Sequence, residues 1–171
     1  MPTLANFQIL YLPPVRVIGR EIRYGMDEHM NGNNRLPAFW ETCFNNNLFA
    51  PLEAIPKSVF DPSYVGLICD WERGDGEFSY VVGMRMIVGT PAPAGYVYYD
   101  LNPCKAAIAW ITGPSVAEIC SSAHEMTLAA GAEHGVRFQN SSWNMELYNC
   151  PRFTTPDADG NITLDYIIPV D

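Results

Sequence analysis

The chain has 171 residues, of which 48% are hydrophobic and 17% are charged, so its composition is that of a globular protein and excludes a disordered one. Ten lysines and arginines stand against nineteen aspartates and glutamates, which gives a formal net charge of -9. This acidic balance, without any cluster of basic residues, argues against nucleic-acid binding, because phosphate backbones require basic surfaces. An acidic surface suits a cationic ligand.

Five widely spaced cysteines occur without a CxxC pair, which argues against a disulfide framework and a zinc site and favours a reducing compartment. They are Cys43, Cys69, Cys104, Cys120 and Cys150. The first residues lack the basic and apolar regions of a signal peptide, and no apolar run approaches the roughly 18 residues that span a bilayer. We therefore expect a cytoplasmic protein without membrane contact, cofactor or metal.

The first half opens with two predicted strands, 7–12 and 15–24, separated by two prolines. A loop is expected at 26–34. Pro37 suits the first turn of a helix that we predict to run to about Phe49, because apolar residues recur there at spacings of three and four. A hairpin is predicted next, with strands 64–69 and 78–88 joined by a Gly-Asp-Gly turn. Residues 89–95, rich in Pro and Gly, are typical of a short extended linker.

The second half repeats this order of elements. Strands are predicted at 96–101 and 105–112, followed by a helix that begins at Ser115 and ends at Gly131 or Gly135. Ser115 and the glutamate three residues later have the spacing of a capping box, which marks the start of a helix.

The second half closes with a predicted hairpin of strands 143–150 and 162–168. Half-repeats of about 7–88 and 96–170 follow from this order, and neither is large enough to close a core comfortably alone. We therefore predict a single domain over 1–171. Its fold class is α+β, a tandem pseudo-twofold strand-helix-strand-strand repeat that forms one antiparallel sheet with two helices on one face and a cleft between them.

The ordered set of elements, together with four groups of residues, resembles the GyrI-like domain, also known as the AraC-type effector-binding domain. The matching groups are Ser79-Tyr80-Val-Val-Gly83, Pro103 with the apolar strand into Thr112-Gly113-Pro114, Met145-Glu146-Leu147-Tyr148, and Asp159-Gly160 through Leu164-Asp165-Tyr166-Ile-Ile-Pro169. The resemblance covers about 7–170 and extends more loosely to stand-alone members carried on integron gene cassettes.

The resemblance implies a small-molecule site in the cleft between the helices. In multidrug-responsive regulators of this kind, a buried glutamate on the penultimate strand faces lipophilic cations, and the matching position here is Glu146. Some relatives instead hydrolyse cyclopropanoid DNA-alkylating compounds, and others act on DNA gyrase. The chain departs from the regulators in having no DNA-binding segment, and from many relatives at 106–111, where they carry larger aromatic and His residues.

The residues themselves also single out Glu146, because a carboxylate inside an aromatic and apolar strand is costly unless it is paired or awaits a cation. Strand alternation places Tyr148 on its face and the two flanking apolar residues on the other. The alternative is that Glu146 pairs with Arg85 or Arg152 and only supports the fold.

Other candidate ligand contacts are aromatic and methionine side chains elsewhere in the chain, and core filling is the alternative for each. They are Phe39, Trp40, Tyr80, Met84, Trp110 and Tyr166. The sequence does not decide whether Trp110 faces the core or the cleft. The three histidines have no metal-ligand spacing and are predicted to be surface residues.

These features predict a bacterial, stand-alone, multidrug-type binding domain for lipophilic organic cations, in preference to an enzyme. One alternative is a GyrI-like hydrolase of cyclopropanoid electrophiles, with Glu146 as general acid or base and Tyr148 assisting. Another is an interaction module that inhibits DNA gyrase. A partner protein or a homodimer is compatible with each of these functions.

Overall fold

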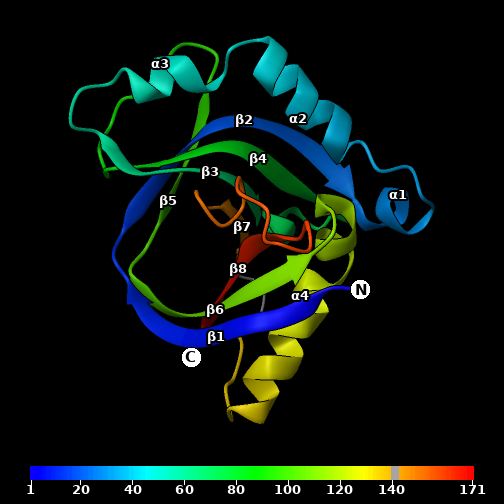
Figure 1. Ribbon diagram of the computed structural model, residues 1–171. Coiled ribbons are helices and arrows are strands. Elements are labelled where there is room, and N and C mark those ends of the chain that lie inside the picture. The colour runs from blue at the N-terminus through cyan, green and yellow to red at the C-terminus, as the bar shows by residue number, and fades with distance from the viewer. Residues whose placement is uncertain (140–142) are drawn as a thin grey trace. The chain divides into compact units, whose positions relative to one another are not determined.

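A computed structural model describes residues 1–139 and 143–171, and the chain divides into two compact units (Figure 1). The central unit comprises Pro14–Asn102, and the terminal unit combines Met1–Pro13 with Pro103–Asp171. Both units are α+β, and the strand pairings described within each unit are antiparallel, which confirms the predicted fold class.

The central unit has four strands in the order β3-β4-β2-β5, with helices inserted between β2 and β3. Its elements are β2 (Val15–Gly25), α1 (Met26–Met30), α2 (Leu36–Asn45), α3 (Phe49–Glu53), β3 (Val59–Cys69), the 3-10 helix η1 (Trp71–Arg73), β4 (Glu77–Met86) and β5 (Val97–Leu101).

The terminal unit has four strands in the order β1-β6-β8-β7 and one long helix between β6 and β7. Its elements are β1 (Thr3–Leu12), β6 (Cys104–Gly113), α4 (Val116–Glu133), β7 (Asn144–Tyr148) and β8 (Ile162–Val170). No helix among the described residues is both long and apolar enough to cross a bilayer.

The predicted repeat is present, because β2, the α1–α3 segment, β3 and β4 follow the same order as β6, α4, β7 and β8. The strand that precedes each repeat belongs to the other unit. β1 comes before β2 in the chain but pairs with β6, and β5 comes before β6 but pairs with β2. The two units therefore exchange their first strands.

Two predictions in the first half are wrong. Residues 26–30 form α1 where a loop was expected, and Asp27 and Glu28 in its only turn suit the positive end of a helix dipole. The helix predicted to reach Phe49 ends at Asn45, and a separate helix, α3, starts at Phe49. Asn47 lies between them with a φ of 55°, a left-handed conformation that asparagine tolerates and that breaks a helix.

Helix α4 forms as its sequence predicts. The Ser115 side chain accepts a hydrogen bond from the backbone N–H of Glu118, which caps the first turn. Its buried residues, including Ile119 and Ala123, pack on Leu164 and Tyr166 of β8, so one face of the terminal sheet is covered by this helix.

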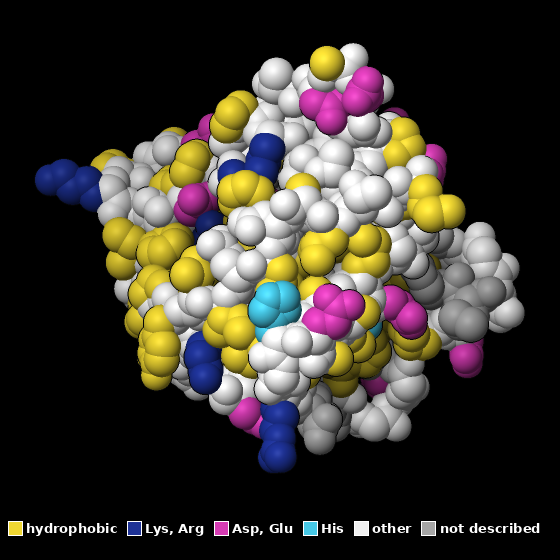
Figure 2. Space-filling model, turned by 60° about the horizontal axis from the view of Figure 1, so that its bottom comes forward, with side chains coloured by type: hydrophobic (Ala, Val, Ile, Leu, Met, Phe, Trp, Pro, Cys, Tyr) yellow, Lys and Arg dark blue, Asp and Glu magenta, His cyan; other side chains and the backbone are white. Residues whose placement is uncertain are grey.

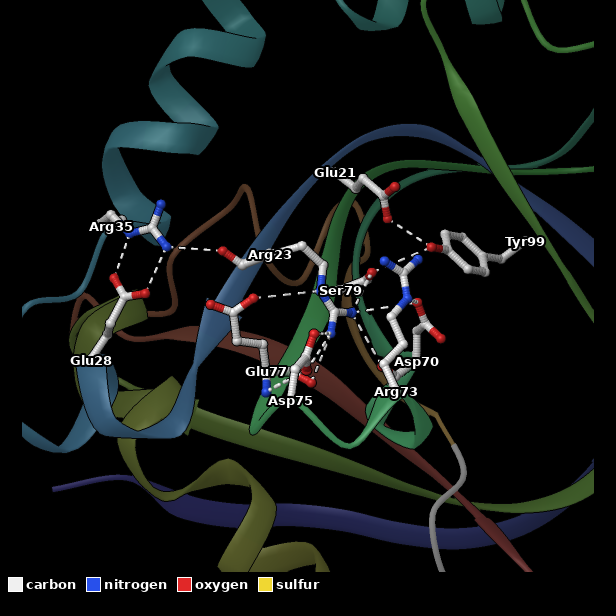
Figure 3. Close-up of polar contacts among 10 residues, drawn as sticks. All are labelled: Glu21, Arg23, Glu28, Arg35, Asp70, Arg73, Asp75, Glu77, Ser79 and Tyr99. Atoms are coloured by element: carbon white, nitrogen blue, oxygen red, sulfur yellow. Dashed lines mark hydrogen bonds and ion pairs between the residues drawn. The ribbon is translucent and has the colours of Figure 1, made fainter.

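The core of the central unit lies between its helices and one face of its sheet. Cys43 of α2 and Leu52 of α3 are buried against Tyr80 and Met84 of β4. On the other face, Arg23 of β2 holds the loop between β3 and β4 (Figure 3). Its guanidinium donates to Asp70 and Asp75 of that loop and to the hydroxyl of Ser79. Arginine thus neutralises the acidic turn of this hairpin.

Two glycines lie opposite each other in the antiparallel pair of β2 and β4. Gly19 and Gly83 are register partners. A Cβ atom built on Gly19 would overlap the backbone carbonyl of Val82, and one on Gly83 would overlap that of Ile18. The close approach of the two strands therefore requires glycine at both positions.

We expect Gly19→Ala and Gly83→Ala each to lower the free energy of unfolding by about 1–3 kcal/mol or more, since backbone atoms cannot yield as a flexible side chain does. Urea denaturation measures the effect. Gly25→Ala is the matched control on β2, because its Cβ would meet nothing closer than 3.9 Å. Equal stability of all three variants would contradict the requirement for glycine at positions 19 and 83.

Candidate functional site

Glu146 lies in the middle of β7 and is buried, with a residue exposure of 7%. It stands opposite Tyr166 of β8 in the antiparallel ladder. Tyr166 belongs to the core beneath α4, and Tyr148 packs against the same core. The alternation predicted for β7 is therefore confirmed, and the sheet places the Glu146 carboxylate on the face that α4 covers.

The phenol of Tyr148 holds this carboxylate. Its hydroxyl donates a hydrogen bond to Oε2 of Glu146 at 2.8 Å. The ring of Phe153 packs edge-on against the ring of Tyr148, with 4.8 Å between the centroids and an interplanar angle of 80°. A neutral donor of this kind stabilises a carboxylate without removing its charge.

Helix α4 brings two further polar side chains to the same place. Burial raises the pKa of the Cys120 thiol, and the adjacent Glu146 carboxylate raises it further, so the thiol stays protonated at neutral pH. One turn later, Nδ1 of His124 lies 3.3 Å from the hydroxyl of Tyr166. Partial burial of the imidazole lowers the pKa of His124, so its neutral form is favoured.

Tyr166 connects the two parts of this cluster. Burial raises the pKa of its phenol, and the charge of Glu146 adds to the effect. The cluster of Cys120, His124, Glu146, Tyr148 and Tyr166 therefore combines one carboxylate with a thiol, an imidazole and two phenols. It can offer negative charge, aromatic surface and weak hydrogen-bond donors to a molecule that reaches it.

The sequence missed the contribution of α4. His124 is exposed, as predicted, but its Nδ1 also reaches the hydroxyl of Tyr166. Cys120 is not among the site residues that the sequence predicts. The sequence does indicate that Cys120 and His124 share one helical face, because they are four residues apart. The sequence alone did not show that this face would lie over Glu146.

Trp110 lies on the other face of the terminal sheet. Its neighbours on β6, Ala109 and Ile111, belong to the core beneath α4, so alternation directs Trp110 away from that helix. The guanidinium of Arg152 lies 4.2 Å from the centre of the Trp110 ring. Within the terminal unit, Trp110 is thus separated by the sheet from the face that carries Glu146.

Both arginines that the sequence offered as partners of Glu146 bind other carboxylates. Arg152 makes a two-pronged contact with Asp165, at 2.7 and 2.5 Å. Arg85 pairs with Asp61 at 3.3 Å.

The remaining candidates lie in the central unit and pack together there. Nε1 of Trp40 donates to the hydroxyl of Tyr80 at 2.9 Å. Met84 and Tyr80 are buried in the core of this unit, and Phe39 packs against it. Trp40 keeps part of its surface exposed next to the ring of Phe44. Their participation in a ligand site with Glu146 stays a prediction.

Solved structures share this arrangement of elements over almost the whole chain. An integron cassette protein from the mobile metagenome of Vibrio cholerae aligns with a TM-score of 0.65 and 17% identity, covering 99% of each chain. A putative transcription regulation protein from Staphylococcus aureus MU50 aligns equally well, with a TM-score of 0.65 and 17% identity, over 97% of this chain and 98% of its own.

SAV2435, solved with tetraphenylphosphonium bound, aligns with a TM-score of 0.65 and 16% identity over 97% of this chain and 94% of its own. This chain has their fold. No family model matches the sequence, and no curated protein matches it either. The likeness is therefore one of structure, and it agrees with the fold that the sequence motifs implied.

The pair of Asp165 and Arg152 gives a prediction about stability. The side chain of Asp165 is 4% exposed, so Asp165→Asn leaves a guanidinium beside a neutral group in a buried setting. We expect this variant to lose about 1–3 kcal/mol of unfolding free energy, because the remaining guanidinium of Arg152 is 30% exposed and keeps part of its hydration.

The matched control is Asp100→Asn, which breaks a similar two-pronged contact with Arg16 where the carboxylate is 43% exposed. Thermal unfolding of both variants at one ionic strength measures the difference. Asp100→Asn should change stability only slightly, since water and salt screen exposed pairs. Equal losses in the two variants would contradict a special role for the buried pair.

Proposed function

We propose that this chain binds lipophilic organic cations and that Glu146 supplies the counter-charge. The observation that carries the proposal is the buried Glu146 carboxylate, held by the Tyr148 hydroxyl at 2.8 Å on the helix-covered face of β7. As the resemblance to effector-binding domains implies, the chain would carry the ligand-binding domain of that family. It would sequester its ligand or report it to a separate protein.

The physical reason is that charge attraction grows as water is excluded. Two unit charges about 4 Å apart interact several times more strongly at the effective dielectric of a protein than in bulk water. A ligand that brings its own apolar surface keeps water out of the contact. A small hydrated cation loses this advantage, because it must shed its hydration shell to reach a buried carboxylate.

Aromatic rings next to the carboxylate favour the same class of ligand. Tyr148 donates to Glu146 and Tyr166 lies opposite it in the ladder, and each of these two ring faces can add a cation–π attraction of about 0.5–2 kcal/mol. Flat aromatic surface imposes few hydrogen-bond demands, so ligands of different shape are tolerated. This tolerance is what a multidrug-type site requires.

The comparison with SAV2435 supports the ligand class. That protein was solved with tetraphenylphosphonium, a lipophilic cation that cannot donate hydrogen bonds. Trp40, Phe39, Tyr80 and Met84 pack together in the central unit, and their part in ligand binding stays a prediction. Trp110 is a weaker candidate, since it lies on the sheet face opposite Glu146 within its unit.

Calorimetric titration with tetraphenylphosphonium tests the proposal. We expect Glu146→Gln to weaken binding about tenfold or more, which corresponds to about 1.4 kcal/mol, because the substitution removes the charge and keeps the shape. Triphenylphosphine oxide is a neutral probe of related shape, and its weaker binding should change little.

Asp159→Asn is the control for net charge, because it removes an exposed carboxylate from a turn of the terminal unit. It should leave the affinity for the cation unchanged. Equal weakening of the cation and the neutral probe by Glu146→Gln, or no binding of the cation by the unaltered protein, would refute the assignment.

The hydrogen-bonded pair of Glu146 and Tyr148 also favours a second candidate, a hydrolase of cyclopropanoid electrophiles. Here the Glu146 carboxylate removes a proton from water, and the water oxygen bonds to one carbon of the strained ring. The carbon–carbon bond of the ring breaks, and its electron pair stays on the other carbon. That carbon side of the molecule takes up a proton delivered by Tyr148. The product is the substrate plus one water.

Mass spectrometry separates this candidate from a binding protein. A hydrolase converts an excess of a cyclopropane-containing alkylating compound to a product heavier by one water, and Glu146→Gln abolishes the conversion. Recovery of the compound unchanged, at the rate of a protein-free control, excludes the hydrolase and leaves the binding function intact.

A further inference from the structure

Strand β1 is an outermost strand of the terminal unit and carries no charge. It spans ten residues, Thr3–Leu12, and pairs with β6 on one side. In the described ranges, 1–139 and 143–171, no strand pairing is found on its other side. None of the first fifteen residues is Asp, Glu, Lys, Arg or His, and the two prolines next to the strand, Pro2 and Pro13, lie outside it.

Soluble proteins ordinarily protect such an edge by shortening the strand or placing charges on it. The edge strand of the central unit, β5, does both. It has five residues, and Asp100 on it binds Arg16. Strand β1 has a bulge between Leu4 and Asn6 but continues in regular register from Asn6 to Leu12. That second segment is unprotected.

The side chains of this segment are apolar and accessible. Ile9, Leu10 and Tyr11 are 38%, 43% and 80% exposed, and they point to both faces of the strand. The surface that carries β1 in Figure 1 comes forward in Figure 2, where hydrophobic side chains reach the surface between charged ones. Three consecutive exposed apolar residues on a free edge indicate a pairing surface.

We propose that β1 pairs antiparallel with β1 of a second copy of this chain and thereby forms a two-fold symmetric dimer. The backbone edge of β1 is complementary to itself when two copies run antiparallel about a two-fold axis. The net charge of -9 on each copy opposes association least where neither copy presents a charge, and 6–12 is such a segment. A two-fold axis at Ile9 places Phe7 of one copy opposite Tyr11 of the other, an aromatic cross-strand pair.

Light scattering coupled to size-exclusion chromatography tests the dimer. The unaltered protein should elute at twice its monomer mass of 19.1 kDa. Ile9→Glu and Ile9→Lys should each elute as monomers, because like charges then meet at the axis. An equimolar mixture of the two variants should restore the dimer, since opposite charges meet there.

Tyr98→Glu is the control, because it adds a charge to the β5 edge, where Tyr98 is 51% exposed. This variant should remain dimeric. A monomeric unaltered protein, or a dimer that persists in Ile9→Glu, overturns the proposal. Neither outcome affects the cation titrations, which test Glu146.

A crosslink gives a second readout that needs no charged residue in the strand. In a background with Cys150→Ser, which removes the exposed thiol, Ile9→Cys should form a disulfide-linked dimer under mild oxidation. Opposed residues in an antiparallel pair have Cα atoms about 4.5–5.5 Å apart, within the range that a disulfide spans. Tyr98→Cys in the same background should stay unlinked. Absence of the Ile9→Cys crosslink overturns the proposal.

Discussion

The cost of burying a carboxylate is the constraint on which the candidate site depends. Glu146 is 7% exposed on a strand whose neighbours are aromatic and apolar, so its charge must be stabilised within the structure. Tyr148 supplies a hydrogen bond, and α4 covers the same face with Cys120 beside the carboxylate. The strand register and the placement of this helix create the environment on which the proposed cation binding at Glu146 depends.

Carboxylates elsewhere in the chain show the more common solution. Asp165, Asp61 and Asp100 are each bound by an arginine, and Arg23 holds two further aspartates in the β3–β4 loop. These pairs tie elements of the fold together and neutralise part of the large negative charge. The phenol of Tyr148 donates a hydrogen bond to the Glu146 carboxylate without bringing a positive charge to it, and the proposed binding of an organic cation depends on this kind of contact.

Local signals in the sequence predicted much of the fold. Ser115 marked the start of α4, turn residues marked both hairpins, and alternation put Glu146 and Tyr148 on one face of β7. The exchange of first strands could not be predicted, because it depends on pairing between distant segments. Likewise, the pairing of Glu146 with Tyr166 and the coverage by Cys120 and His124 arise from tertiary packing, which periodicity alone does not specify. The first helix broke at Asn47 because one left-handed residue outweighed an otherwise regular apolar stripe.

A crystal structure of the protein with tetraphenylphosphonium bound would show whether Glu146 is the counter-charge of the ligand. We expect the phosphonium centre beside the Glu146 carboxylate, with the phenyl groups against aromatic side chains that include Tyr148. A cation bound elsewhere on the molecule, or a Glu146 carboxylate paired with an arginine of the chain in the complex, would contradict cation binding by Glu146.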